Sequence, residues 1–107
     1  MMKKYKVVIT SEARNDLRNI TAYILKVLKN QQASKNVLSD FAQTRKVLSA
    51  TAGSIKESDS KILRHRDLKR INFRKHRYFL LFRMDDDAVR ITNVFCDLQD
   101  YENKLNE

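Results

Sequence analysis

The residues best suited to chemistry lie in one basic stretch, residues 64–79, which reads RHRDLKRINFRKHRYF. Seven of its side chains are Lys or Arg and only one, Asp67, is acidic, so most of the chain's net charge of +9 is concentrated there. Guanidinium and ammonium groups at this density bind phosphates or acidic protein surfaces. The stretch is therefore interpreted as a surface for a polyanionic or acidic partner.

Few other side chains could take part in catalysis. His65 and His76 are the only histidines and Cys96 is the only cysteine. This inventory provides neither an internal disulfide nor a recognisable zinc pattern, so we predict no metal and no cofactor. Histidine is the side chain that exchanges protons near neutral pH, which makes His76 a candidate general base, although a histidine in a turn is more often a plain surface residue.

Length and composition predict one cytoplasmic domain. A chain of 107 residues with 42% hydrophobic residues is long enough to bury a core. No apolar run approaches the length of a membrane span, and the initial Met-Met-Lys-Lys lacks a signal-peptide core. Because the chain has one Gly and no Pro, we see no linker and expect residues 1–107 to form a single domain without a membrane partner.

The first half of the chain predicts a strand and two helices. Residues 5–9 (YKVVI) form the strand, which ends at Thr10 and Ser11, either of which can cap a helix. Two runs with helical spacing follow, separated by the polar residues 29–32, so the helices should fold back as a hairpin. Their expected core faces are Ala13, Leu17, Ile20, Ile24 and Val27, then Ala33, Val37, Phe41, Thr44 and Leu48.

The second half predicts three strands. Residues 51–60 read as a polar loop, and alternation with a period of two then indicates strands at 68–75, 78–84 and 88–95. Residues 85–87 (DDD) are interpreted as a hairpin turn rather than a metal site. In the last strand, the alternation predicts Val89, Ile91 and Phe95 on one side of the sheet.

This order of elements predicts an α+β fold. It is a two-layer domain with an N-terminal strand, an α-helical hairpin and a three-strand antiparallel meander, with the helices on one sheet face. Alternation should direct Arg70, Arg74 and Arg77 to the other, open face. Because Phe79 and Leu81 should also point there, we expect the C-terminal tail or a partner to cover them.

Motifs along essentially the whole chain resemble the RelE/ParE superfamily of bacterial toxins. YKVVITSEARNDLRNITAYI resembles the opening strand and first helix, HRYFLLFRMDDDAVRITNVF the paired strands, and DLQDYENKL the closing segment. The resemblance implies a toxin of a type II toxin–antitoxin (plasmid stabilization) module, neutralised by a cognate antitoxin. RelE-like members cleave mRNA on the ribosome without a metal, and ParE-like members inhibit DNA gyrase.

The resemblance also assigns candidate site residues. It aligns Phe79 with the usual catalytic arginine and Cys96 with a position that is often histidine. Arg77, two residues before Phe79, could replace the missing charge, and His76 is the candidate base. Tyr101 could assist proton transfer, as C-terminal tyrosines do in some relatives. An antitoxin laid over the open face would contact Phe79 and Leu81. The candidates for binding nucleic acid or another target are Arg64, Arg66, Lys69, Arg70, Arg74, Lys75, Arg77 and Arg83.

Several functions are compatible with this sequence. The chain could be an mRNA interferase with an atypical active site, a non-enzymatic ParE-like gyrase inhibitor, or a detoxified member retained as an antitoxin-binding partner. A different interpretation is a small RNA-binding domain in which Tyr78 and Phe79 stack on bases. The absence of an RNP-like Lys/Arg-Gly-Phe pattern argues against that interpretation.

Overall fold

A four-stranded mixed sheet forms the centre of the molecule, for which a computed structural model describes residues 4–96. Its strands are β1 (Lys6–Ile9), β2 (Lys69–Asn72), β3 (Tyr78–Asp85) and β4 (Ala88–Cys96), arranged in the order β1-β4-β3-β2. Strand β1 runs parallel to β4, whereas the other neighbouring pairs are antiparallel. The first strand of the chain therefore lies beside the last, next to the predicted meander.

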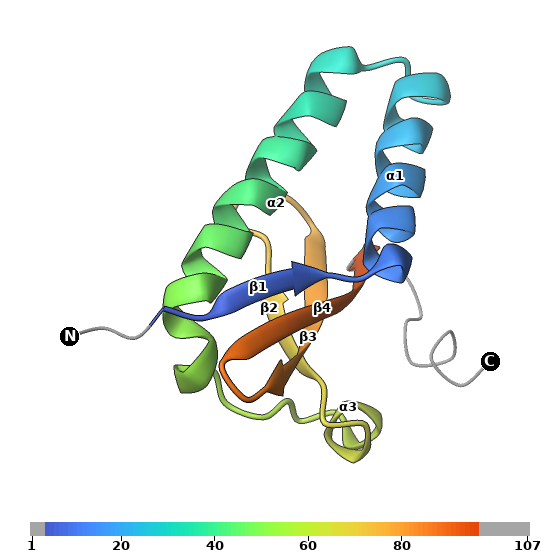
Figure 1. The fold of residues 1–107 in the computed structure, drawn as a ribbon. Helices are drawn as coiled ribbons and strands as arrows, with labels where there is room; N and C mark the ends of the chain where they lie inside the picture. The colour runs from blue at the N-terminus through green and yellow to red at the C-terminus, as the bar shows by residue number, and fades with distance from the viewer. Residues whose placement is uncertain (1–3, 97–107) are drawn as a thin grey trace.

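Two long helices form the predicted hairpin, α1 (Ser11–Lys26) and α2 (Gln31–Thr51) (Figure 1). Each begins at a side-chain cap, because the Thr10 hydroxyl accepts the Ala13 N–H at 3.2 Å and Asn30 Oδ1 accepts the Ala33 N–H at 2.9 Å. A 3₁₀ turn, η1 (Ala52–Ser54), continues directly from α2. The α+β class and the helical hairpin on one sheet face are thus confirmed.

The main core lies between the α1–α2 hairpin and the sheet. It contains the predicted helix faces together with side chains from β3 and β4. Val27 is the exception, since it caps the C-terminal end of α1 and is 61% exposed. The fully buried members of this core include Ala13, Leu48, Leu80, Phe82, Val89 and Ile91.

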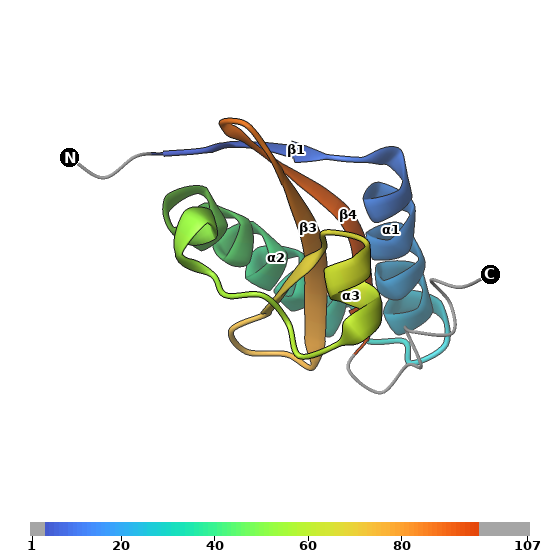
Figure 2. The same ribbon diagram turned by 90° about the horizontal axis from the view of Figure 1, so that it is seen from below.

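A short helix that the sequence analysis missed, α3 (Lys61–His65), covers part of the opposite sheet face (Figure 2). Its Leu63 is fully buried and forms a second hydrophobic cluster with Leu68, Phe79, Leu81 and Phe95. Phe79 and Leu81 are buried in this cluster, where α3 and the residue preceding β2 pack against them. The tail that was expected to cover them lies outside the described residues. We refer to these five residues as the α3 cluster.

A β-bulge in β4 changes which way the end of the strand faces. Leu81 pairs with Asn93 and Phe82 with Ile91, so Thr92 is an extra residue in the ladder. A bulge of this kind reverses the alternation of the residues that follow it. The prediction that Phe95 shares a side with Val89 and Ile91 is therefore wrong, since Phe95 lies in the α3 cluster.

Strand β2 is shorter than predicted. It ends at Asn72 rather than at Lys75, and residues 73–77 form the connection to β3. Arg74 and Arg77 lie in this connection, which we call the β2–β3 loop, so strand alternation does not place them on one face with Arg70. Strand β2 ends early because hydrogen bonds fasten the backbone of the loop to α2.

Candidate functional site

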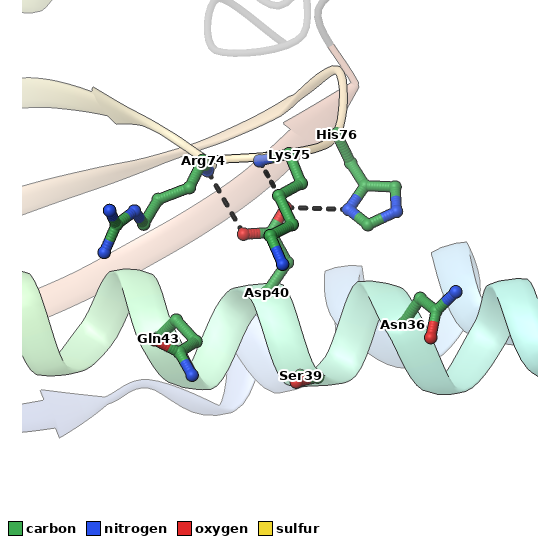
Figure 3. A pocket seen from close by; sticks show the side chains of 7 residues that line it. All are labelled: Asn36, Ser39, Asp40, Gln43, Arg74, Lys75 and His76. Atoms are coloured by element: carbon green, nitrogen blue, oxygen red, sulfur yellow. Dashed lines mark hydrogen bonds and ion pairs between the residues drawn. The ribbon is translucent and has the colours of Figure 1, made fainter.

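Asp40 on α2 is the residue that holds the β2–β3 loop. Its side chain is only 2% exposed and its two carboxylate oxygens accept three hydrogen bonds (Figure 3). Oδ1 accepts the Arg74 N–H at 3.1 Å, and Oδ2 accepts the Lys75 N–H at 2.9 Å. The ring Nδ1 of His76 lies 2.7 Å from Oδ2. Successive residues of the loop are thus fastened to one buried carboxylate.

The Asp40–His76 contact defines how the imidazole ring is oriented. An ionised carboxylate can only accept hydrogen bonds, so Nδ1 is the nitrogen that carries a hydrogen here. The other ring nitrogen, Nε2, points away from Asp40 (Figure 3). Holding one imidazole nitrogen by a carboxylate leaves the second one in a defined tautomer for another partner.

The ionisation of Asp40 depends on these bonds. Burial by itself raises the pKa of the carboxyl group, but the hydrogen bond from His76 and the backbone N–H groups of Lys75 and Arg74 favour the charged form. Their combined effect exceeds that of burial, so the pKa of Asp40 lies below its ordinary value. Asp40 is therefore a buried anion at neutral pH.

A polar pocket lies beside this carboxylate, between α2 and the β2–β3 loop (Figure 3). The helix contributes uncharged polar groups and the loop contributes cationic ones, while Asp40 forms the boundary between them. Its lining residues are Asn36, Ser39, Asp40, Gln43, Arg74, Lys75 and His76. Such a wall of amide, hydroxyl and cationic donors is suited to an anionic ligand.

The predicted target-binding residues fall on more than one part of the surface. Arg74, Lys75 and Arg77 lie on the β2–β3 loop, whereas Arg64, Lys69 and Arg83 line a hollow next to α3. Arg66 is close to the second group, because its carbonyl oxygen accepts a hydrogen bond from Arg83 Nη2 at 2.8 Å. The basic stretch is therefore divided rather than forming one continuous strand face.

Arg70 lies on the sheet face that carries the α3 cluster. Its guanidinium carbon is 3.8 Å from the centroid of the Phe79 ring, a cation–π contact, and its Nε donates to Asn72 Oδ1 at 2.9 Å. Phe79 itself is only 1% exposed. This face thus presents an arginine stacked over a buried aromatic ring.

The predicted catalytic residues are not assembled with one another by the described part of the chain. His76 lines the α2 pocket, and Arg77 is exposed in the loop just before β3. Tyr101 lies outside the described residues. Tyr78, opposite Cys96 in the β3–β4 register, has its pKa raised by burial and by the neighbouring Cys96 and Tyr23, so it keeps its proton.

Sequence reasoning missed Asp40 altogether. The available signal was an acidic residue within the run of core positions in α2, three residues after Val37 and next to Phe41. A buried carboxylate requires a partner, but the run itself does not reveal that the partner is the β2–β3 loop. Within residues 4–96, no group of three or more His, Cys, Asp or Glu side chains could hold a metal ion.

Among the described helices, none has both the length and the apolar character that crossing a membrane requires. Neither a family model nor a curated protein sequence matches the chain.

Solved structures do match the chain. A structure of the chromosomal ParDE toxin–antitoxin system from P. aeruginosa matches with a TM-score of 0.73 and 16% identity, covering 88% of this chain and 97% of that one. The toxin–antitoxin complex RelBE2 from Mycobacterium tuberculosis matches with a TM-score of 0.57 and 25% identity, covering 90% and 94%. The first similarity concerns the fold alone.

These comparisons define the class of protein by its fold. An N-terminal strand, a helical hairpin and a strand meander make up a toxin fold that is also found in toxin–antitoxin complexes. The chain has the fold of the RelE/ParE superfamily, which its sequence motifs predicted.

Proposed function

We propose that this chain is the toxin of a type II toxin–antitoxin pair and that it inhibits its target by binding, without cleaving RNA. The observation that supports this proposal is the α3 cluster. Phe79, aligned with the catalytic arginine of RNA-cleaving relatives, is 1% exposed and packs with Leu63 and Phe95. The place of a phosphate-binding cation is taken by a hydrophobic core.

The chemistry of RNA cleavage explains why this substitution matters. The pentavalent phosphate carries extra negative charge, which must be met by donors fixed at hydrogen-bond distance. Phe79 has no such donor, and the nearby Arg70 is engaged with the Phe79 ring and with Asn72. This sheet face is therefore better suited to protein contact than to phosphoryl chemistry.

The partner we propose is a cognate antitoxin, and the target is DNA gyrase. Both similar structures are of toxin–antitoxin systems, which supports an antitoxin for this chain. A net charge of +9 suits an acidic antitoxin segment. Gyrase is the target that the superfamily resemblance assigns to ParE-like members, which inhibit without RNA cleavage.

A second candidate, ribosome-dependent mRNA cleavage, is favoured by the Asp40–His76 pair. A histidine oriented by a buried carboxylate, with Arg74 and Lys75 beside it, has the composition of a general base next to phosphate-binding cations. Such a site would lie on the α2 side of the sheet rather than under α3.

Inducing the gene in a bacterial host, with and without the neighbouring open reading frame, tests the proposal. We expect growth arrest that the neighbour relieves, intact mRNA by primer extension, and relaxed plasmid DNA with a DNA-damage response. Cleavage within codons would instead establish the RNase, and harmless overexpression with retained binding to the neighbour's product would indicate a detoxified member.

A further inference from the structure

We propose that the pocket between α2 and the β2–β3 loop binds a phosphate group of a nucleic-acid backbone. The proposed site lies on a different part of the molecule from the α3 cluster. It does not depend on the proposed function, because a toxin with either target, or with none, retains the pocket.

The pocket supplies the donors that a phosphate requires. Arg74 and Lys75 contribute positive charge from the loop, and the side-chain amides of Asn36 and Gln43 contribute N–H donors from α2. Arg74 and Lys75 are both exposed, so their side chains can move to meet a ligand. Half or more of the hydrogen bonds between proteins and DNA are of this kind, from such side chains to phosphate and sugar oxygens.

Asp40 is an anion in the wall of this pocket, yet it does not cancel the pocket's preference for a negatively charged ligand. Its oxygens already accept the Arg74 and Lys75 N–H groups and His76 Nδ1, and its side chain is 2% exposed. The carboxylate thus organises the cationic loop from within. A phosphate would meet the loop side chains rather than the carboxylate oxygens.

His76 forms part of the pocket wall beside the cations of the loop. Its Nδ1 lies 2.7 Å from Asp40 Oδ2, and Nε2 points away from that carboxylate (Figure 3). The contact fixes the orientation of the ring next to the side chains that would meet a phosphate.

The surroundings favour a polyanion over a single ion. Asp40 is the only acidic residue of α2, whose exposed side chains include Lys35, Arg45 and Lys46, and residues 73–77 contain no acid. A backbone of regularly spaced phosphates can bridge the loop and the helix. RNA and DNA share this chemistry, so we expect the site to accept either one.

Fluorescence anisotropy with labelled single-stranded RNA and DNA of the same sequence tests the site. Arg74→Gln and Lys75→Gln should each weaken binding of both strands by about three- to tenfold and lower the salt slope by about one. Arg18→Gln is the matched control, because it removes the same charge from an exposed position on α1, outside the pocket. Equal weakening by Arg18→Gln, or no binding by the wild type at low salt, would overturn the proposal.

A further arm separates a specific site from general charge. Unlabelled poly-glutamate at equal charge should compete poorly. Competition as strong as that of nucleic acid would assign the pocket to an acidic peptide and contradict the inference. Growth arrest is measured in a separate experiment, so the proposed toxin function and the proposed phosphate site can each fail independently of the other.

Discussion

The guanidinium carbon of Arg70 lies 3.8 Å from the centroid of the Phe79 ring, so an arginine from β2 covers the aromatic residue of β3 that the superfamily resemblance aligns with a catalytic arginine. This face therefore carries the positive charge of Arg70, but the guanidinium group is stacked on the Phe79 ring instead of being directed at a phosphate. Leu63 of α3 is buried in the same cluster as Phe79. We infer that the residue types on this face stabilise the domain.

Truncating Phe79 should show this structural role. Phe79→Ala removes a ring that is 1% exposed, and we expect it to lower the free energy of unfolding by about 3–5 kcal/mol, from lost burial and the cavity left behind. Urea denaturation measures the change. Leu38→Ala is the control, since Leu38 is 46% exposed and should change stability by less than about 0.5 kcal/mol. A loss for Phe79→Ala as small as that of the control would contradict the role of the cluster.

Removing the charge of Asp40 should loosen the β2–β3 loop. In Asp40→Asn the amide cannot accept all three hydrogen bonds, and we expect a loss of about 1–3 kcal/mol, measured by urea denaturation. Asp59→Asn is the same substitution at an exposed position and should be nearly neutral. Equal effects of the two substitutions would show that Asp40 does not hold the loop.

The contribution of Asp40 to the free energy of unfolding should also depend on pH. Because its pKa is lowered in the folded state, the stabilisation is fully present above the unfolded-state value of about 3.9 and is lost as the pH falls through the folded-state pKa. The stability difference between wild type and Asp40→Asn should therefore shrink in acid. A difference that stays constant from neutral pH to about pH 3 would rule out a lowered pKa.

The β-bulge in β4 should depend on Asp16 of α1. Asp16 Oδ2 accepts the Val94 N–H at 3.0 Å and lies 3.4 Å from Asn93 Nδ2, just past the extra residue Thr92. Asp16→Ala leaves the Val94 N–H without this acceptor, and we expect a loss of about 1–3 kcal/mol. Amide hydrogen exchange at Val94 should accelerate more than at Val89, which precedes the bulge. Unchanged exchange at Val94 would contradict this role.

Periodicity in the sequence predicted most of the fold. The helical spacing of Ala13, Leu17, Ile20 and Ile24 and the cap at Thr10 are local properties, so they were visible without the structure. The bulge at Thr92 was not visible, because it arises from pairing with β3 and from the bond to Asp16. Helix α3 is a single short turn whose stability comes from burying Leu63, which depends on the tertiary fold.

The candidate site was predicted less completely. Charge density identified Arg74 and Lys75 as binding candidates, because cations are recognisable from sequence alone. His76 was a catalytic candidate because of the proton chemistry of histidine. Their organiser, Asp40, is separated from His76 by 36 positions along the chain, and only the packing of α2 against the loop brings the two together. Strand alternation also placed Arg70 and Arg74 on one face, an error caused by the early end of β2.

Supercoiling by purified DNA gyrase in the presence of the purified chain tests the central claim most directly. The account predicts that the chain inhibits supercoiling, that adding the neighbouring gene's product restores it, and that mRNA on translating ribosomes stays intact at the same concentration. Full supercoiling activity together with codon-specific cleavage of the mRNA would contradict the account.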